Sequence, residues 1–288
     1  MAIGTDIWTW FRGDWTQANL PILGSADHAT WQGTLVFDGA RLMEGYAPDL
    51  DLHCERIVRS ATAMGLSSPY TAEEIRQLIQ NGIRNFPRGV DLYLRPMMWS
   101  TEGSAGFIDA DPNSTELAIV LEALPMSEPG PFALTVSPYK RPHPDSAITQ
   151  AKAACLYPNN GRILLEARNR GFNNALSLDL DGHVAETAST NAFMVKDGVF
   201  YTPVPNGTFL NGITRQRVIK LLQEAGHEVV EKSLTVEDFA NADEIFTTGN
   251  ANKVQAVSRF EDRELPTEQG LMVRQLYLDY ARSRPAIR

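Results

Sequence analysis

The sequence predicts an α+β fold made of two domains. Strand-like and helix-like segments do not alternate strictly, which disfavours a doubly wound parallel sheet. Two Asp-Gly pairs, at 181–182 and 197–198, lie between alternating apolar runs. They predict β-hairpins, whose tight turns need positive φ angles. The stretch 124–131 contains three prolines and a glycine, which a regular element does not tolerate.

These features define the expected domain organisation. We expect an N-terminal α/β domain over residues 1–124, an interdomain linker over 125–132 and a C-terminal domain over 133–288. No internal repeat or low-complexity tract interrupts this division. The second half contains both Asp-Gly hairpins and is therefore expected to be richer in strands.

The elements of the first half follow from periodicity and turn residues. Apolar residues recur at helical spacing within 49–66, and Asp49 or Asp51 is placed to cap that helix. The sequence Thr-Ala-Glu-Glu at 71–74 resembles a capping box and predicts the start of a second helix. Strands are expected at 34–37, 91–99 and 116–122.

In the second half, the two hairpins are accompanied by helices with an apolar face. These helices are expected at 161–170, 214–225, 236–240 and 268–283.

Composition excludes several classes of protein. Apolar residues make up 43% of the 288 residues and charged residues 21%, as in ordinary soluble globular proteins. A net charge of −9 disfavours nucleic acid or an anionic membrane as a partner. Two cysteines, Cys54 and Cys155, cannot form a secreted disulfide framework, so a cytoplasmic location is expected. The first eight residues show no signal peptide, and the apolar run 117–124 is too short to span a bilayer.

Four short motifs suggest chemistry in the second half. Lys152 lies in Ala-Lys-Ala-Ala-Cys-Leu-Tyr, and an apolar setting favours the neutral, nucleophilic amine. Glu186 follows the first Asp-Gly pair and is followed by Ser-Thr-Asn-Ala-Phe at 189–193. Leu-Asn-Gly-Ile-Thr-Arg at 210–215 precedes a predicted helix whose N-terminal N–H groups suit an anion. The last motif is Thr-Gly-Asn-Ala at 248–251. Taken singly, Lys152 could be a solvated surface lysine and Glu186 an exposed strand residue.

In this order and spacing, the motifs resemble the fold-type IV enzymes that use pyridoxal phosphate (PLP). That family includes branched-chain aminotransferases, D-amino acid aminotransferases, (R)-selective amine transaminases and aminodeoxychorismate lyase. The resemblance spans about residues 36–257 and is strongest over 152–251. It implies a homodimer that binds PLP between its two domains.

The resemblance also implies a role for each cofactor-binding residue. Lys152 corresponds to the lysine that forms the Schiff base and moves the proton. Glu186 matches the partner of the pyridine nitrogen, and Tyr157 the partner of the phenolic oxygen. Asn250 stands where the family usually has a threonine, and its amide can still donate to phosphate. The other residues implied for the phosphate and the ring are Arg56, Leu210, Gly212, Ile213, Thr214, Thr248 and Gly249.

Substrate preference is read from the first half. Tyr-Leu-Arg-Pro at 93–96 matches the branched-chain aminotransferases, but Asp38 stands where they have a tyrosine that holds the substrate carboxylate. An aspartate there would repel a carboxylate, which favours an (R)-amine. Alternatively, Asp38 is a turn residue that points away. Phe37, Met43 and Trp99 could form an apolar wall, or all three could be ordinary core. The candidate substrate residues are Phe37, Asp38, Arg41, Met43, Tyr93, Arg95 and Ala251.

The leading hypothesis is a PLP-dependent transaminase that moves an amino group from a primary (R)-amine or D-amino acid to a keto acid such as pyruvate. Arg41 and Arg95 would hold the keto acid. The alternatives are a branched-chain amino acid aminotransferase using α-ketoglutarate, a lyase of the aminodeoxychorismate type, and a binding protein with a vestigial site. No Walker or Rossmann glycine loop and no metal-ligand spacing is present in the sequence.

Overall fold

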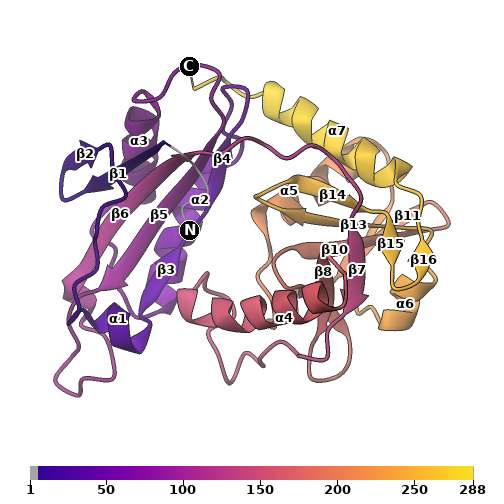
Figure 1. Cartoon of the computed structure of the whole chain (residues 1–288), viewed down its shortest axis with the longest axis horizontal. Coiled ribbons are helices and arrows are strands. Elements are labelled where there is room, and N and C mark those ends of the chain that lie inside the picture. The colour runs from indigo at the N-terminus through magenta and orange to yellow at the C-terminus, as the bar shows by residue number, and fades with distance from the viewer. Residues whose placement is uncertain (1–5, 288) are drawn as a thin grey trace. The chain divides into compact units, whose positions relative to one another are not determined.

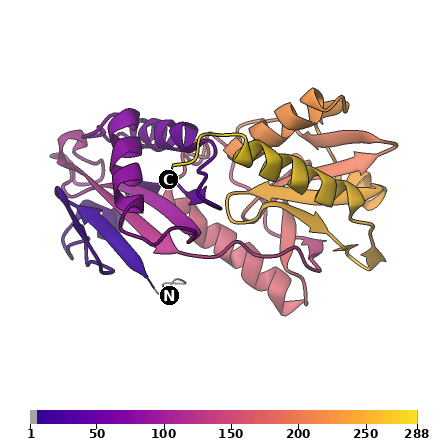
Figure 2. The ribbon, with the colours of Figure 1, turned by 90° about the horizontal axis from the view of Figure 1, so that it is seen from above.

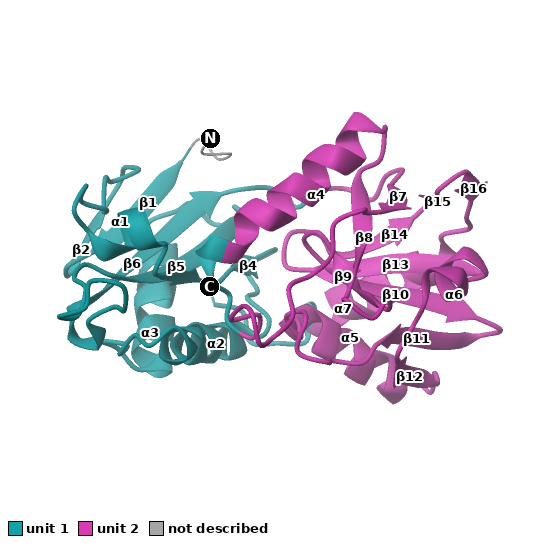
Figure 3. Ribbon diagram, turned by 90° about the horizontal axis from the view of Figure 1, so that it is seen from below, with its two compact units in different colours: residues 1–126, 151–155, 281–288 teal, residues 127–150, 156–280 magenta. Residues whose placement is uncertain are grey.

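The computed structural model describes residues 6–287, so the expectation about the first eight residues falls largely outside the described part. The chain divides into two compact units (Figure 3). Unit 1 comprises residues 1–126, 151–155 and 281–288, and unit 2 comprises 127–150 and 156–280. The first segment of unit 1 ends at Met126, which lies within the predicted linker 125–132.

Two segments belong to a different unit from the one that the sequence predicted. Residues 151–155 and 281–288 were expected in the C-terminal domain but belong to unit 1. The first segment is held by a β-bridge between Ala153 and Val36. In the second, the Ile287 N–H donates to the Gly45 carbonyl at 2.9 Å. Hydrogen bonds between residues this far apart in sequence are set by tertiary packing.

Unit 1 is built on one antiparallel sheet with the order β2-β1-β6-β5-β3, and β4 also pairs with β5. Helices α2 and α3 pack against each other and cover one face of this sheet (Figures 1 and 2). The strands are β1 (Ile7–Phe11), β2 (Asp14–Thr16), β3 (Leu35–Phe37), β4 (Ala40–Leu42), β5 (Leu92–Ser100) and β6 (Thr115–Ala123). The helices are α1 (His28–Gln32), α2 (Leu50–Ala63), α3 (Ala72–Ile83) and the 3₁₀ turn η1 (Pro112–Ser114).

The predicted helices of unit 1 are present, but one predicted cap is wrong. The capping box of α3 is confirmed, because Thr71 accepts from the Glu74 N–H at 3.2 Å and the Glu74 side chain accepts from the Thr71 N–H at 2.7 Å. Asp49 occupies the N-cap of α2 with a φ of 57° and makes no capping bond. Its left-handed backbone differs from the extended conformation that a capping side chain needs. Asp51 lies inside the first turn.

Unit 2 contains two five-stranded sheets, with the orders β12-β11-β10-β13-β14 and β16-β15-β7-β8-β9. Buried apolar residues from both sheets, such as Leu176, Met194 and Ile245, form one core cluster. The strands are β7 (Ala133–Val136), β8 (Asn174–Leu178), β9 (Val184–Thr187), β10 (Asn191–Lys196), β11 (Val199–Pro203), β12 (Val229–Lys232), β13 (Glu244–Gly249), β14 (Lys253–Val257), β15 (Arg259–Phe260) and β16 (Arg263–Glu264). The helices are α4 (Tyr157–Asn169), α5 (Ile213–Glu224), α6 (Val236–Ala240) and α7 (Glu268–Arg282), of which α7 has its last two residues in unit 1. The 3₁₀ turn η2 (Ala154–Leu156) begins in unit 1 and ends in unit 2.

Both Asp-Gly hairpins are confirmed. Asp197 and Gly198 join β10 to β11 with φ angles of 49° and 78°, as a type I′ turn requires. Gly182, with a φ of 92°, lies in the loop between the antiparallel strands β8 and β9. Helices α5, α6 and α7 lie within a residue of their predicted positions. Helix α4 begins at Tyr157, earlier than predicted, because Pro158 fits the first turn of a helix.

This mixture of helices with largely antiparallel sheets confirms the α+β class. Within residues 6–287, no helix combines the length and the apolar character that crossing a membrane would require.

Candidate functional site

The lysine segment is fixed to the sheet and to helix α2 of unit 1. The Lys152 carbonyl accepts from the Phe37 N–H at 3.1 Å, and the Lys152 N–H donates to Ser60 Oγ at 3.0 Å. The neighbouring Ala151 and Ala153 are buried. Lys152 Nζ lies 4.9 Å from the Phe37 ring centroid, within range of a cation–π interaction. The amine is therefore carried on a rigid backbone. Ser60 gave no sequence signal, because it lies 92 residues away.

Asp38 is fully buried in unit 1 and is part of an ion pair. Arg56 donates from Nε to Oδ2 at 2.6 Å and from Nη2 to Oδ1 at 2.8 Å. His53 Nδ1 lies 2.7 Å from Oδ1. Burial would raise the pKa of Asp38, but Arg56 and His53 hold it well below its usual range. The negative charge of Asp38 is thus neutralised locally, which weakens the argument that it repels a substrate carboxylate.

The same ion pair bears on the role expected of Arg56. Its Nε and Nη2 atoms bond to Asp38, in the bidentate geometry that makes arginine–carboxylate pairs strong. Arg56 therefore has a structural function in unit 1, and its contact with phosphate stays a prediction.

Two arginines share one face of the sheet of unit 1 with Tyr93. Arg41 on β4 lies opposite Tyr93 on β5, and Arg95 is two residues further along β5. The Arg95 guanidinium lies 5.4 Å from the Tyr93 ring centroid, and its Nη2 is 3.8 Å from Glu122 Oε2. Arg41 is buried and donates from Nη1 to the Leu124 carbonyl. Burial lowers the pKa of Arg41, against the opposing effects of Asp91 and Tyr93.

The Nε atoms of Arg41 and Arg95 are buried and have no hydrogen-bond partner among the described residues. An unpaired donor in such a place costs about 1–3 kcal/mol or more. Two of them on one face of a sheet suit an anionic ligand such as a carboxylate.

The residues expected to form an apolar wall differ in their surroundings. Met43 is buried, and Phe37 lies beside the Lys152 amine. Trp99 stacks on Phe11 with ring centroids 5.8 Å apart and belongs to an apolar core cluster of unit 1. This packing favours the core alternative for Trp99.

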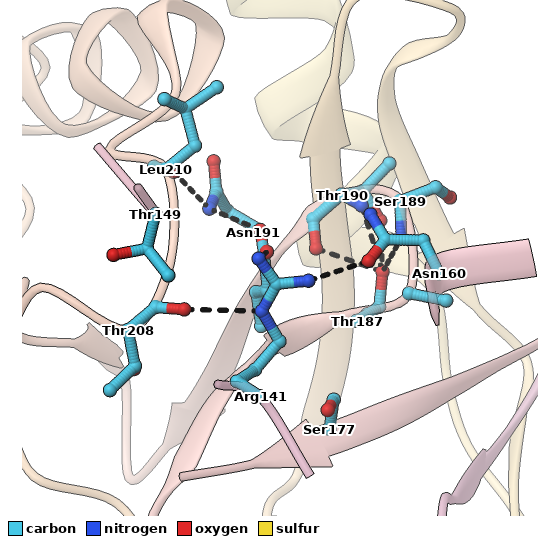
Figure 4. A network of polar contacts seen from close by, with 12 residues as sticks. Arg141, Thr149, Asn160, Ser177, Thr187, Ser189, Thr190, Asn191, Thr208 and Leu210 are labelled. Carbon is cyan, nitrogen blue, oxygen red and sulfur yellow. Dashed lines mark hydrogen bonds and ion pairs between the residues drawn. The ribbon is translucent and has the colours of Figure 1, made fainter. Parts of the chain in front are cut away.

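In unit 2, Glu186 on β9 is held by two residues for which the sequence predicted no role. Arg141 Nη2 lies 3.3 Å from Glu186 Oε1, and Asn191 Nδ2 donates to Oε2 at 3.3 Å. Arg141 is itself fixed, because it donates from Nε to the Thr208 carbonyl at 3.1 Å and from Nη1 to Asn160 Oδ1 at 2.6 Å (Figure 4). Glu186 is buried, so its carboxylate is held in one orientation.

Asn191 also connects Glu186 to the turn that precedes α5. Its Nδ2 donates to the Leu210 carbonyl at 3.0 Å (Figure 4). Gly212 is the N-cap of α5, and a Cβ there would lie only 2.2 Å from Asn191 Oδ1. Only glycine fits this approach. The motif 189–193 thus contains a residue that links the predicted pyridine and phosphate sites.

Arg215, the last residue of the 210–215 motif, braces the turn. It is buried and donates from Nη1 to Asn211 Oδ1 at 2.9 Å and from Nη2 to the Pro203 carbonyl at 2.8 Å. An ion pair with Glu231 at 2.6 Å adds a further tie to β12. Helix α5 therefore begins at a fixed position.

The hairpin between β13 and β14 contains two unsatisfied polar atoms. Thr248 Oγ1 and Asn250 Nδ2 are buried and have no hydrogen-bond partner within the described chain. A Cβ on Gly249 would lie 2.7 Å from Thr190 Cγ2, so the turn is closely packed. Buried polar atoms without partners are costly, and here they suit the oxygens of a phosphate. The residues present therefore fit the phosphate of PLP.

The predicted site residues fall into two sets. Those of unit 1 are Phe37, Asp38, Arg41, Met43, Arg56, Tyr93, Arg95 and Lys152. Those of unit 2 are Tyr157, Glu186, Leu210, Gly212, Ile213, Thr214, Thr248, Gly249, Asn250 and Ala251. Within unit 2, Tyr157 is the first residue of α4, and Ala251 is exposed in the β13–β14 loop.

Known proteins resemble this chain over most of its length. The family model "Amino-transferase class IV" matches residues 35–260. A probable branched-chain-amino-acid aminotransferase of Rickettsia felis is 34% identical over 257 residues, covering 88% of this chain and 86% of the relative. The crystal structure of an aminotransferase from Brucella abortus bound to PLP is 50% identical, with a TM-score of 0.95, and covers 96% of this chain and 100% of that one.

A branched-chain aminotransferase from Thermoproteus uzoniensis, solved with norvaline, is 28% identical, with a TM-score of 0.88 over 96% of this chain and 95% of that one. The unpaired donors of the predicted phosphate site, the rigid lysine segment and these likenesses lead to one conclusion. The chain belongs to the class IV aminotransferases and is a PLP-dependent aminotransferase of fold type IV.

Proposed function

We propose that the protein transfers the amino group of branched-chain L-amino acids to α-ketoglutarate. One observation carries this proposal. The buried Nε atoms of Arg41 and Arg95 lie on one face of a sheet and have no partner among the described residues. Both substrates of such a reaction carry carboxylates, and α-ketoglutarate carries two. Relatives and solved neighbours named as branched-chain aminotransferases support the same choice.

The residues of this chain would divide the chemistry as follows. Bound PLP supplies an electron sink for the bond changes at the substrate Cα. Lys152 Nζ would move the proton between the substrate Cα and C4′ of the cofactor. The hydrogen bonds of the Lys152 backbone fix the position from which its side chain extends. Glu186, oriented by Arg141 and Asn191, would face the pyridine nitrogen.

The remaining binding functions follow from the unpaired groups. Thr248 and Asn250 would donate to the phosphate from the β13–β14 turn. Arg41 and Arg95 would bind substrate carboxylates through their unpaired Nε groups.

An (R)-amine or D-amino acid donor is the second candidate. It is favoured by Asp38, which stands where the branched-chain enzymes have a tyrosine, and by Met43, which stands where they have an aromatic residue. Its electrostatic basis is weak, because Asp38 is paired with Arg56 and His53. No feature of the described residues favours a lyase of the aminodeoxychorismate type.

Half-reactions on PLP-loaded protein separate the two candidates. L-leucine should bleach the visible absorbance of the cofactor, and α-ketoglutarate should restore it. (R)-α-methylbenzylamine and D-alanine are the competing donors, with the (S)-amine as control. Bleaching by the (R)-amine or by D-alanine, without bleaching by L-leucine, would reject the branched-chain proposal.

The homodimer that the family resemblance implies stays a prediction, and so does the cytoplasmic location expected from the cysteine content. Sedimentation equilibrium of the purified holoenzyme should give twice the chain mass of 31.9 kDa. A single-chain mass at micromolar concentration would contradict the dimer.

A further inference from the structure

The β13–β14 hairpin has an unusual residue where its loop ends. Gly249 pairs with Lys253, and three residues form the loop between them. Lys253 has a φ of 60°, in the left-handed region that favours glycine. Such a conformation costs a residue with a Cβ about 1–2 kcal/mol. Backbone strain of this kind often accompanies function, which indicates a role for the side chain of Lys253.

The side chain of Lys253 is fully buried, and its amine contacts Asn250, the first residue of the loop. Lys253 has no exposed surface, and its Nζ donates to Asn250 Oδ1 at 2.7 Å. The ammonium also lies 5.6 Å from the ring centroid of the buried Tyr277. Burying a charged amine costs several kcal/mol unless it is well compensated. The chain thus accepts both a strained backbone and a buried charge at this position.

The contact determines which end of the Asn250 amide faces away from Lys253. An ammonium can only donate hydrogen bonds, so it selects the amide oxygen as its partner. The Nδ2 atom is then the end left to donate elsewhere. This atom is buried and has no hydrogen-bond partner within residues 6–287, and the same holds for Thr248 Oγ1. A serine or threonine hydroxyl can rotate to suit an acceptor, whereas an amide must be oriented.

We propose that Lys253 is a positioning residue for the phosphate turn. Its ammonium holds Asn250 Oδ1 so that Nδ2 is presented to the phosphate of the cofactor. Its positive charge also polarises the amide and strengthens that donor. The inference rests on the proposed assignment of residues 248–250 to phosphate binding. The chemical specificity it confers is for phosphorylated over unphosphorylated forms of the cofactor.

A double-mutant cycle on the apoprotein tests the proposal with two probes. Pyridoxamine 5′-phosphate has the phosphate but cannot bond covalently to Lys152, and pyridoxamine lacks the phosphate. Lys253→Met and Asn250→Ala should each weaken binding of the phosphorylated probe about tenfold, the loss expected for one hydrogen bond that involves a charged group. Binding of pyridoxamine should not change. The double variant should bind no more weakly than Asn250→Ala alone, because Lys253 acts through Asn250.

Controls separate positioning from folding. Lys232→Met removes another lysine beside a tyrosine ring, 4.6 Å from the Tyr201 centroid, and should leave both affinities unchanged. Lys253→Gly relieves the left-handed strain while removing the ammonium. It serves as the deciding variant if Lys253→Met does not give a cooperative thermal transition. Adding Asn250→Thr to Lys253→Met should restore affinity, because a hydroxyl orients itself.

The outcomes are distinguishable. If Asn250→Ala binds pyridoxamine 5′-phosphate like the unsubstituted protein, the phosphate assignment fails and the inference with it. If Asn250→Ala weakens binding but a folded Lys253 variant does not, only the role of Lys253 is rejected. Additive losses in the double variant would show that Lys253 acts independently of Asn250, which also overturns the proposal.

Discussion

At the scale of single residues, the role of Asp38 depends on its buried ion pair more than on its being an aspartate. Asp38 looked from the sequence like a group that could repel a substrate carboxylate, and it stands where related enzymes have a tyrosine. In the fold it accepts two hydrogen bonds from Arg56 and lies 2.7 Å from His53. An ion paired in this way contributes mainly to the stability of unit 1, because removing one partner leaves a buried charge unmatched.

Replacing Asp38 by Asn should therefore reduce stability and leave the choice of substrate unchanged. Arg56 would keep a buried charge without its partner, at a cost of about 3–5 kcal/mol. Urea denaturation measures the loss, and Asp145→Asn, whose side chain is 91% exposed, is the matched control. A changed ratio of L-leucine to (R)-amine activity in a folded Asp38→Asn protein would show that Asp38 faces the substrate.

The same pair predicts a dependence on pH. The pKa of Asp38 is lowered in the folded protein, so its stabilising effect is complete above its unfolded pKa of about 3.9. The effect is lost as pH falls towards the folded value. The stability difference between the unsubstituted protein and Asp38→Asn should thus shrink as pH is lowered below about 4. Urea midpoints from pH 7 downwards test this, and a constant difference would contradict it.

Arg95 is the residue whose loss should reveal the carboxylate site. Replacing it by Leu removes a guanidinium with a buried, unpaired Nε. Because hydrogen bonds to charged groups are worth about 1.5–3 kcal/mol, KM for α-ketoglutarate should rise about tenfold or more. KM for the monocarboxylate L-leucine should change less. Equal losses for both substrates would count against a second-carboxylate role, and Arg12→Leu, on an exposed side chain of the same unit, is the control.

At the scale of elements, the predicted phosphate-binding residues of unit 2 lie in or beside turns. The turn before α5 is held by Arg215, and the β13–β14 hairpin by the Lys253–Asn250 contact. Local turn chemistry is visible in sequence, because glycine and asparagine at fixed positions mark such turns. The contacts that Arg215 makes with Pro203 on β11 and with Glu231 on β12 are visible only in the fold, since these partners come from other strands.

Gly212→Ala should disturb the turn before α5 by steric conflict alone. The added Cβ would lie 2.2 Å from Asn191 Oδ1, and Asn191 bonds to both Glu186 and the Leu210 carbonyl. Overpacking of this kind costs about 1–3 kcal/mol, and PLP affinity should fall with it. Gly161→Ala, where a Cβ meets nothing within 4 Å, should leave PLP affinity unchanged. Fluorescence titration with PLP compares the two, and equal affinities would contradict the prediction.

At the scale of the whole molecule, the lysine predicted to be reactive and its predicted partners belong to different compact units. Lys152 lies in a five-residue segment of unit 1, whereas Glu186 and both predicted phosphate turns belong to unit 2. A chain organised in this way can lose its chemistry without losing either core, because Lys152 is not among the buried core residues of the described chain.

Lys152→Ala should accordingly abolish turnover and preserve the fold. Circular dichroism should match that of the unsubstituted protein, while L-leucine no longer bleaches bound cofactor. PLP that still binds through its phosphate should continue to raise the unfolding temperature, by linkage worth about 2.7 kcal/mol at a hundredfold excess over its dissociation constant. Normal turnover by Lys152→Ala would show that another group is the reactive amine.

Local features of the sequence determined several turns and helices of this protein and its family. Both Asp-Gly hairpins, the Thr71 capping box and helices α5 to α7 follow from turn chemistry and short-range periodicity. The class IV aminotransferase family also follows from the order of the motifs. Each turn, cap and motif depends on residues a few positions apart, so a single sequence displays it.

Only the tertiary structure decided which side chains meet across long separations. Ser60 bonds to the Lys152 backbone across 92 residues, and Arg141 reaches Glu186 from a different segment. Segment 151–155 belongs to unit 1 because Ala153 bridges to Val36. The carboxylate of Asp38 is paired with Arg56 and lies beside His53, both on α2, which weakens the inference drawn from its identity alone. Packing sets these contacts, and it depends on the whole chain rather than on any local pattern.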